Sequence, residues 1–477
     1  MQPLYIYDSR QKQKVLLQPI QENQVKIYIC GPTVYDYSHL GHARSAIAFD
    51  LLWRTLELSG YAVQMVKNFT DIDDKIIAKA QAEQVEIQAL SVRFMASYLA
   101  DMQALGVQRA HLEPKASEHL DAMVAMIQAL LDKGHAYKTD HGDIYLDTST
   151  DRAYGTLSAH SLDQESVSRL EDNPQKRHEK DFALWKSYKG SNDVGYESPF
   201  GKGRPGWHIE CSSMIFANVA YRDQSYQIDI HGGGSDLFFP HHENEASQTR
   251  CAFDRELAKY WMHNGFVNIS GEKMSKSLGN SFYIKDALRV YDGEILRNYL
   301  LGVHYRAALH FNEEDLLASK KRLDKIYRLK KRALELKALN SIGTPQHDFT
   351  HALLACMQDD LNISKALSVL EEHLHYSNEQ LDTLNKNAKK QRAQNILADL
   401  AFVEMLLGLG GKDPTLYFQL GVDDALKTHI QTQIDLRLQA KKLKDFVLAD
   451  RIREDLAKQG ISLMDTPTST TWEKLCY

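Results

Sequence analysis

Cysteine is scarce in this chain, and long apolar runs are absent. The sequence has five cysteines in 477 residues, too few and too widely spaced for the disulfide framework of a secreted domain. No apolar run approaches the roughly 20 residues that span a bilayer. The first residues lack the basic and then apolar layout of a signal peptide. We therefore expect a cytoplasmic protein without membrane association, whose cysteines are reduced thiols or metal ligands.

An excess of positive charge is also missing, since the formal net charge is -6. The composition as a whole therefore gives no indication of a nucleic-acid partner. One segment differs, because residues 320–332 hold eight basic residues and one acid. A charge run is usually a solvated helix face, but a concentrated basic segment can also hold a phosphate backbone. Internal repeats and low-complexity tracts are absent.

The most informative segment covers residues 26–42. A strand ends there in a Gly-Pro turn, and an apolar helical pattern begins after His39 and His42. Both histidines are thus expected at the N-terminus of a helix, where free N–H groups and the helix dipole suit phosphate. Gly41 lets a ligand approach the backbone closely. The alternative is a capped βα unit with two surface histidines.

A second predicted strand, over residues 62–66, leads into a polar segment with Thr70, Asp71 and Asp73. Residues just beyond the carboxyl end of a parallel strand lie where open α/β sheets bind ligands. Asp and Thr are also ordinary helix caps, so both interpretations stay open. A single long helix is predicted over residues 75–105.

Two glycine-bearing segments are candidates for contact with a charged ligand. Gly232, Gly233 and Gly234 continue a predicted strand and allow close backbone approach, although the run is neither a G-x-G-x-x-G nor a Walker pattern. Lys273 and Lys276 lie in a loop bracketed by glycines, which suits the placing of positive charge against polyphosphate. The alternatives are an ordinary strand end and a surface turn with two solvated lysines.

Four residues have the types and positions of metal ligands. His241 and Glu245 are four apart on a predicted helix and so share one face. Cys30 and Cys211 lie at ends of predicted sheet elements, and zinc accepts imidazole, carboxylate and thiolate. If those ends converge, the four residues form one site; otherwise the cysteines are small apolar residues of the core. The rival ligands on the helix are His242 and Glu243.

The remaining pattern predicts an insertion and a helical C-terminal half. A helix over residues 116–133, a hairpin over 136–146 and a polar stretch over 158–180 interrupt the α/β pattern. After about residue 300 the strands are expected to stop until a short one near residue 461, and helices are predicted over residues 312–338, 349–375 and 377–407. The predicted fold class is therefore α/β: a Rossmann-type nucleotide-binding domain split by an insertion, followed by an all-α helical bundle and a small C-terminal module. The expected domains are 1–115 and 205–300 for the two catalytic halves, 116–204 for the insertion, 301–410 for the helical domain and 411–477 for the C-terminal module.

In this order and spacing, the motifs resemble those of class I aminoacyl-tRNA synthetases. His39-Leu-Gly-His42 is similar to the "HIGH" motif, and Lys273-Met-Ser-Lys-Ser277 matches the "KMSKS" motif. The blocks that begin at Cys30, Asn68, Gly206 and His231 resemble the cysteinyl-tRNA synthetase family specifically. This resemblance extends over essentially the whole chain and includes the helical and C-terminal segments, which are similar to that family's anticodon-side domains.

The resemblance implies a reaction in two steps. The carboxylate of L-cysteine attacks the α-phosphorus of ATP, and the 2′-OH of the terminal tRNA ribose then attacks the cysteinyl-adenylate. ATP with Mg²⁺, L-cysteine and a cysteine tRNA are thus the expected substrates of a monomer. One zinc ion per chain is implied, which favours the soft sulfur over a serine hydroxyl without an editing domain.

The resemblance also implies a role for each candidate residue. The zinc ligands would be Cys30, Cys211, His241 and Glu245. The catalytic residues, which act on the phosphates, would be His39, His42, Lys273 and Lys276. The residues that contact ATP would be Gly41, Gly232, Gly233, Gly234 and Lys276. The residues that contact cysteine would be Trp207, Asp236 and Thr70.

Two other functions compete with the synthetase. One is an ATP-dependent ligase of the same catalytic fold that joins cysteine to a small amine acceptor. The helical segments after residue 300 argue against it, because a small acceptor needs no such extension. The other is a non-catalytic tRNA-binding or zinc-binding protein, for which the motif histidines and lysines would be dispensable, yet all four are present.

Overall fold

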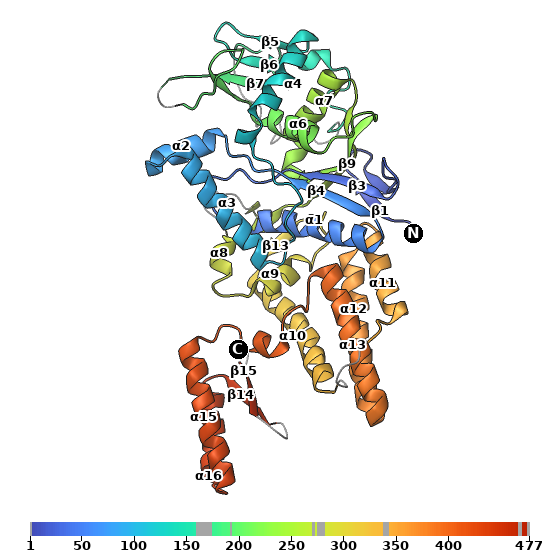
Figure 1. Ribbon diagram of the computed structural model, residues 1–477, viewed down its shortest axis with the longest axis vertical. Coiled ribbons are helices and arrows are strands. Elements are labelled where there is room, and N and C mark those ends of the chain that lie inside the picture. Colours follow the sequence, from blue (N-terminus) through green and yellow to red (C-terminus); the bar gives the residue numbers. More distant parts are fainter. Residues whose placement is uncertain are drawn as a thin grey trace. The chain divides into compact units, whose positions relative to one another are not determined.

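The chain folds into two compact units in this computed structural model (Figure 1). Unit 1 comprises Met1–Ser319 and Thr350–Leu370, and unit 2 comprises Lys320–Phe349 and Glu371–Tyr477. The structure describes residues 2–158, 174–190, 193–269, 272–273, 282–336, 343–465 and 470–474. Within these residues no helix is long and apolar enough to cross a membrane.

A parallel four-stranded sheet is the centre of unit 1. Its strands are β10 (Glu256–Asn264), β9 (Tyr226–Gly234), β3 (Gln24–Ile29) and β4 (Ala62–Lys67), in that spatial order. Helix α1 (Leu40–Leu58) connects β3 to β4. The chain leaves β3 toward β4 on one side and reaches β9 on the other, so the strand order reverses between β3 and β9. This doubly wound order confirms the predicted Rossmann-type fold and places the expected ligand crevice at the carboxyl ends of β3 and β9.

The segment after β4 forms two helices rather than the single predicted one. Helix α2 (Asp74–Glu83) ends at Gln84, whose φ of 55° is left-handed, and α3 (Ile87–Ala104) begins after Glu86. The Gln84 N–H bonds back to carbonyls of α2, which completes a C-cap. The prediction of one helix over residues 75–105 was therefore wrong. Neither Gly nor Pro marks the break, so the sequence carries no strong signal for it.

A second, antiparallel sheet interrupts the α/β pattern between β4 and β9. Strands β5 (Ala136–Lys138), β6 (Ile144–Leu146), β7 (Phe182–Ser187) and β8 (Gly203–Pro205) pair in sequence order, and the predicted hairpin is β5–β6. The short helix η1 (Ala116–Glu118) precedes this region, and η2 (Thr148–Thr150) lies between β6 and β7. Helices α4 (Leu120–Asp132), α6 (Trp207–Asn218) and α7 (Glu243–Phe253) share one apolar core with this sheet and with all four strands of the central sheet. The predicted insertion therefore has a sheet of its own, packed on the helices that precede and follow β9.

Short strands complete unit 1. β1 (Tyr5–Asp8) pairs with β2 (Gln13–Leu16), and β11 (Val267–Ile269) pairs with β12 (Glu272–Lys273) and with β13 (Leu309–Phe311). β13 shows that the prediction of no strand soon after residue 300 was wrong. Its pairing partner β11 lies 42 residues earlier, and a three-residue strand gives too little alternation to be found in the sequence. Helices α8 (Ile284–Ala287) and α9 (Gly293–Leu300) connect β12 to β13.

The chain returns to unit 1 at residues 350–370, where a single predicted helix is broken. Helix α11 (His347–Gln358) ends before Asp360, and α12 (Ile363–Thr383) begins after it. The buried Asp360 carboxylate accepts the Tyr7 N–H at 2.9 Å, the Tyr305 hydroxyl at 2.8 Å and the Arg306 Nε–H at 2.9 Å. Asp360 has a φ of 57° and Leu361 one of 52°. Long-range contacts thus override the helical pattern that predicted one helix over residues 349–375.

Unit 2 is helical apart from one hairpin. Helix α10 (Glu313–Leu336) enters it, followed by the rest of α12 and by α13 (Lys386–Leu407), α14 (Pro414–Phe418), α15 (Asp424–Lys442) and α16 (Phe446–Lys458). The hairpin consists of β14 (Ile461–Asp465) and β15 (Thr470–Lys474). This arrangement agrees with the predicted helical part and C-terminal module.

The basic run of residues 320–332 lies on α10 and forms ion pairs within unit 2. Arg328 and Lys331 bond to Glu473, and Arg332 bonds to Asp382. The other pairs are Lys320 with Asp324, and Arg322 and Lys325 with Glu371. Because most of these basic side chains form ion pairs with acidic residues, the basic run by itself does not indicate a phosphate-binding site.

Candidate active site

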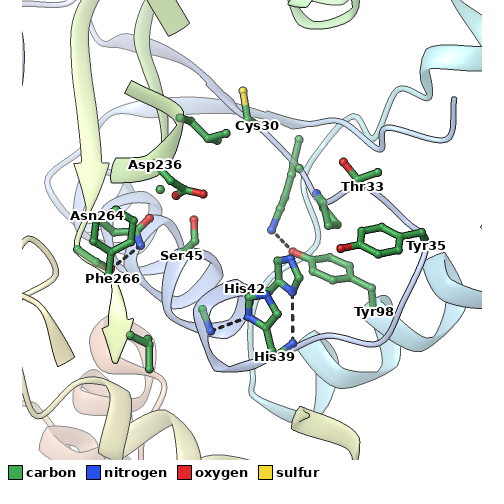
Figure 2. A pocket seen from close by; sticks show the side chains of 18 of the residues that line it. Cys30, Thr33, Tyr35, His39, His42, Ser45, Tyr98, Asp236, Asn264 and Phe266 are labelled. Atoms are coloured by element: carbon green, nitrogen blue, oxygen red, sulfur yellow. Dashed lines mark hydrogen bonds between the residues drawn. The ribbon is translucent and has the colours of Figure 1, made fainter. Parts of the chain in front are cut away.

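A cavity of about 480 Å³ lies at the carboxyl-terminal edge of the central sheet (Figure 2). Cys30 and Thr33 reach it from the segment after β3, Asp236 from the segment after β9, and Asn264 and Phe266 from the end of β10. The first turn of α1 lines it as well. The cavity therefore spans the point between β3 and β9 at which doubly wound sheets bind nucleotides.

Two stacked histidines stand at the N-terminus of α1. His39 is the N-cap, and its Nδ1 accepts the Gly41 N–H at 3.1 Å. The His39 N–H donates in turn to Nδ1 of His42 at 3.3 Å. The two rings stack with centroids 3.9 Å apart and line the cavity. This reciprocal capping fixes both rings beside the positive end of the helix dipole, where anions are stabilised.

The glycines divide between lining the cavity and shaping the sheet. Gly41 and Gly234 line the cavity. Gly232 and Gly233 lie buried within β9, where an added Cβ would collide with neighbouring side chains, the ring of Phe49 among them. Of this run, Gly234 alone is among the lining residues that the structure describes.

Two thiols, an imidazole and a carboxylate converge beside the cavity. The ligand atoms of Cys30, Cys211, His241 and Glu245 all lie within 4.8 Å of one another. The two sulfurs are 3.8 Å apart, and His241 Nε2 lies 2.7 Å from Glu245 Oε1. Cys30 comes from the end of β3, Cys211 from α6, and Glu245 from α7, so distant segments meet as the sequence analysis anticipated. We call these four residues the first ligand group.

A second group of four overlaps the first. Cys30 and Glu245 also meet His231 and His242, again with ligand atoms within 4.8 Å. The Cys30 sulfur lies 3.4 Å from His242 Nε2, whose ring also contacts His263 at 2.8 Å. Sequence analysis named His242 as a rival but missed His231. The other rival, Glu243, instead accepts hydrogen bonds from the backbone and hydroxyl of Ser158.

The electrostatics of the first group suit a cation. A hydrogen bond from Cys30 lowers the pKa of the Cys211 thiol to about 7. Burial would raise the pKa of Glu245, but the facing His241 and His231 imidazoles lower it well below its usual range. His231 Nδ1 donates to the Tyr28 carbonyl oxygen at 2.9 Å, and its Nε2 contacts the Glu245 carboxylate. The donor set of the first group is that of tetrahedral zinc.

The residues predicted to contact an amino acid take different positions. Trp207 is 38% exposed, lines the cavity and stacks on His241 with ring centroids 4.1 Å apart. Asp236 also lines the cavity. Thr70 bridges to Thr33 through the backbone, but it is buried, and its hydroxyl donates to Glu210 at 3.1 Å. The first two side chains can meet a ligand directly, whereas the Thr70 hydroxyl is engaged within the protein.

The two predicted lysines are only partly within the described residues. Lys273 ends β12, and of this residue the structure describes the backbone alone. Lys276 lies outside the described residues. Their proposed contact with phosphate stays a prediction.

The lining residues that the sequence did not indicate include Tyr35, Lys67, Lys75 and Tyr98. Lys67 is the last residue of β4, at the same sheet edge as the predicted ligand residues. Its position at a strand end was a usable signal. Lys75 and Tyr98 become visible only once α2 and α3 are placed beside the sheet, whereas Tyr35 lies in the segment between β3 and α1.

Comparisons with known proteins agree over almost the entire chain. The family described as "tRNA synthetases class I (C) catalytic domain" matches residues 16–321. The cysteine–tRNA ligase of Helicobacter pylori strain HPAG1 is 63% identical over 471 residues, which cover 99% of this chain and 100% of the relative. That of Wolinella succinogenes is 60% identical over 469 residues, which cover 98% of this chain and 99% of the relative.

Solved structures show the same fold at low identity. The methionyl-tRNA synthetase of Mycobacterium tuberculosis in complex with methionyl-adenylate superposes with a TM-score of 0.61 and 17% identity, covering 83% of this chain and 94% of that chain. A leucyl-tRNA synthetase from Agrobacterium radiobacter has a TM-score of 0.59 and 11% identity, covering 84% of this chain and 86% of that chain. These neighbours establish the architecture.

Proposed function

The chain belongs to the cysteine–tRNA ligase family of class I aminoacyl-tRNA synthetases, and from this premise we propose how its cavity activates L-cysteine and transfers it to tRNA. The observation that carries the proposal is the position of Cys30. It belongs to the cluster of ligand atoms and also lines the cavity, beside the capped N-terminus of α1. A substrate thiol bound at the cluster can therefore lie in the same cavity as the phosphates of ATP.

In the first step the cysteine carboxylate oxygen attacks the α-phosphorus of ATP. The bond from that phosphorus to the bridging oxygen breaks, and pyrophosphate leaves with Mg²⁺. His39 and His42, together with the N–H groups of α1, stabilise the phosphate charge. Lys273 and Lys276 add positive charge to the leaving group, and Gly41 and Gly234 leave room for the nucleotide.

The proposed cofactor is one zinc ion, held by the first ligand group. Two thiolates, an imidazole and a carboxylate are the donors that zinc prefers. When bound, zinc prefers a soft thiolate to a hydroxyl and so separates cysteine from serine. Residues near the zinc ion orient the substrate cysteine. Trp207, which stacks on His241, packs over the amino acid, and Asp236 binds the ammonium group of the amino acid.

In the second step a terminal ribose hydroxyl of tRNA attacks the adenylate carbonyl carbon. The ester bond to tRNA forms, the bond from carbon to the phosphate oxygen of AMP breaks, and the hydroxyl proton leaves with the departing AMP or solvent. The cavity walls exclude water from the adenylate, which would otherwise hydrolyse. Thr70 is buried and forms a backbone bridge with Thr33. It is proposed to position the segment after β3, to which Thr33 belongs.

The two competing functions are less well supported. The relatives that match the chain over 98% or more of its length are named as cysteine–tRNA ligases, and a ligase for a small amine does not explain a helical half that aligns with them throughout. A non-catalytic binding protein does not explain why the histidines of α1 are held at a helix N-terminus within the cavity.

The test is the charging of total tRNA with labelled cysteine, with serine as competitor, before and after zinc is removed by a chelator. We expect charging that is specific for cysteine, stops after chelation and returns when zinc is added. Activation of cysteine without charging of tRNA would favour the ligase for a small amine. Metal-loaded protein that does not activate cysteine would favour the binding protein.

Three further features stay proposals from the sequence: the boundaries between the five predicted segments, a monomeric state and a cytoplasmic location. Light scattering on the purified protein tests the monomer. Limited proteolysis tests the boundaries, because exposed linkers between domains are cut first.

A further inference from the structure

The cavity has a second wall that the roles described above leave unused. It consists of Tyr35, Lys67, Lys75 and Tyr98, and we call it the lysine–tyrosine wall. In Figure 2, Tyr35 and Tyr98 lie on the opposite side of His42 from Asp236, Asn264 and Phe266. The wall belongs to the β4 side of the sheet, whereas the nucleotide crevice of this fold lies between β3 and β9.

Each lysine of this wall is paired with an aromatic ring. Lys67 Nζ donates a hydrogen bond to the Tyr98 hydroxyl and lies 4.8 Å from the centre of that ring. Lys75 Nζ lies 5.7 Å from the centre of the Tyr35 ring. Two ammonium groups and two tyrosines therefore border one space. Positive charge interleaved with aromatic rings is the pattern by which proteins hold single-stranded nucleic acid.

The acidic residues next to this wall have other partners. Asp74 bonds to Arg204 and, at 3.1 Å, to Lys186. Asp71 accepts hydrogen bonds from the backbone and hydroxyl of Ser117. Asp73 caps α2 by accepting the backbone N–H of Lys75. These contacts pair the neighbouring carboxylates with other donors, so their charge opposes the two ammonium groups less.

We propose that the lysine–tyrosine wall binds the 3′-terminal nucleotides of the tRNA, with Lys67 and Lys75 on the last phosphates and the Tyr35 ring against the terminal base, while the buried Tyr98 holds Lys67 through its hydroxyl. The inference rests on the proposed function, because that reaction brings two nucleotides into one cavity. ATP occupies the side of α1 and the β3–β9 crevice. The wall is the remaining side, and it places the terminal ribose within reach of the adenylate.

The first experiment compares Lys75→Ala with Lys79→Ala. Both lysines lie on α2, one turn apart, but Lys79 is 40% exposed, pairs with Glu83 and is not a lining residue. Two rates are measured: cysteine-dependent exchange of pyrophosphate into ATP without tRNA, and single-turnover transfer of cysteine from bound adenylate to tRNA. We expect Lys75→Ala to slow transfer about tenfold or more, the loss of one good nucleotide contact, with exchange within about twofold of the wild type. Lys79→Ala should leave both rates unchanged.

If Lys75→Ala slows exchange and transfer equally, the lysine–tyrosine wall binds ATP rather than tRNA. If it slows neither, the wall has no part in the reaction. Either result overturns the inference. A wild type that does not exchange pyrophosphate with cysteine would instead contradict the proposed function.

A second measurement does not depend on turnover. The affinity of intact tRNA is compared with that of tRNA from which the terminal nucleotide has been removed. We expect the wild type to bind intact tRNA more tightly, and Lys67→Met and Lys75→Ala to reduce that difference by at least half. A thermal melt of each variant shows whether it is folded. An undiminished difference in folded variants would overturn the inference.

Discussion

Cys30 and Glu245 belong to both ligand groups, so the choice lies between Cys211 with His241 and His231 with His242. His241 faces Glu245 and stacks on Trp207, a residue of the cavity wall, whereas His242 faces His263 in the interior. A metal that must meet a substrate has to lie toward the cavity. The first ligand group meets that condition through His241.

We therefore expect His241→Ala to lose the metal and His242→Ala to keep it. Atomic emission on purified protein should find about one zinc per chain in the wild type and little in His241→Ala, because a tetrahedral site needs all four ligands. Cys251→Ser, at a buried thiol in neither group, is the control and should retain zinc. The opposite result for the two histidine variants would assign the metal to the second group.

A buried ion pair behind the site gives a prediction about stability. The Asp50 carboxylate on α1 bonds to Arg54 at 2.7 Å, to Arg297 of α9 and to the Gln108 N–H at 3.0 Å. Burial would raise the Asp50 pKa, but Arg297 and Arg54 lower it below its ordinary value. A carboxyl whose pKa is lower in the folded state stabilises the protein above its unfolded pKa of about 3.9, and the contribution is lost as the pH falls through the folded pKa.

Asp50→Asn should therefore lower the free energy of unfolding at pH 7 by about 3–5 kcal/mol, because Arg297 is left buried without its partner. Urea denaturation between pH 7 and pH 3.5 measures this, and the difference from wild type should begin to shrink below about pH 4, where the Asp50 carboxyl of the unfolded chain takes up a proton. Asp121→Asn, at an exposed position of α4, is the matched control with an expected effect of about 0.5 kcal/mol or less. A difference that stays constant with pH would contradict the ionic origin.

At the scale of elements, the N-cap of α1 is joined to the segment that precedes α8. The Ile284 N–H donates to the Ser38 carbonyl at 2.8 Å, and the Tyr283 hydroxyl donates to Asp36 at 3.1 Å. His39 and Tyr283 also pair as an antiparallel bridge. The backbone that carries His39 is thus held from a segment more than 240 residues later in the sequence.

Tyr283→Phe should lower the turnover rate of pyrophosphate exchange about three- to tenfold, because a hydrogen bond to a charged group that holds His39 is lost. Zinc content and melting temperature should change little. Tyr291→Phe removes a comparable bond, to Glu313 at 2.7 Å, away from the site and serves as the control. Equal effects of the two substitutions would show that Tyr283 has no particular role in positioning.

The sequence predicts elements well where local pattern decides them. The βα unit around β3 and α1 and the hairpin β5–β6 follow from periodicity and turn residues, and the candidate ligands follow from residue type at strand ends. The breaks at Gln84 and Asp360 do not, because tertiary contacts and a left-handed residue without glycine produce them. The strand-end position of Lys67 is a usable signal, but the sequence does not show whether solvent or a ligand lies beside it.

At the scale of the whole molecule, Asp360 completes unit 1 from a distant part of the chain. Asp360→Ala should lower the free energy of unfolding by about 3 kcal/mol or more, since it leaves the Tyr7, Tyr305 and Arg306 donors without their acceptor. Its neighbour Asp359, half-exposed and paired with Lys14, is the control; Asp359→Ala should cost about 1 kcal/mol or less. Calorimetry on both variants measures this. Equal losses would show that the buried contacts of Asp360 add nothing.

The discontinuity of unit 1 has a consequence for how the protein is made. The first segment of unit 1 ends at Ser319, and its last segment is Thr350–Leu370. Between them the ribosome synthesises Lys320–Phe349, which belongs to unit 2. At about 5–20 residues per second, the ribosome needs several seconds to add that stretch. During this interval the nascent catalytic sheet exists without the carboxylate that bonds to β1. The emerging chain therefore acquires its finished enzyme core late, when most of its length has already been translated.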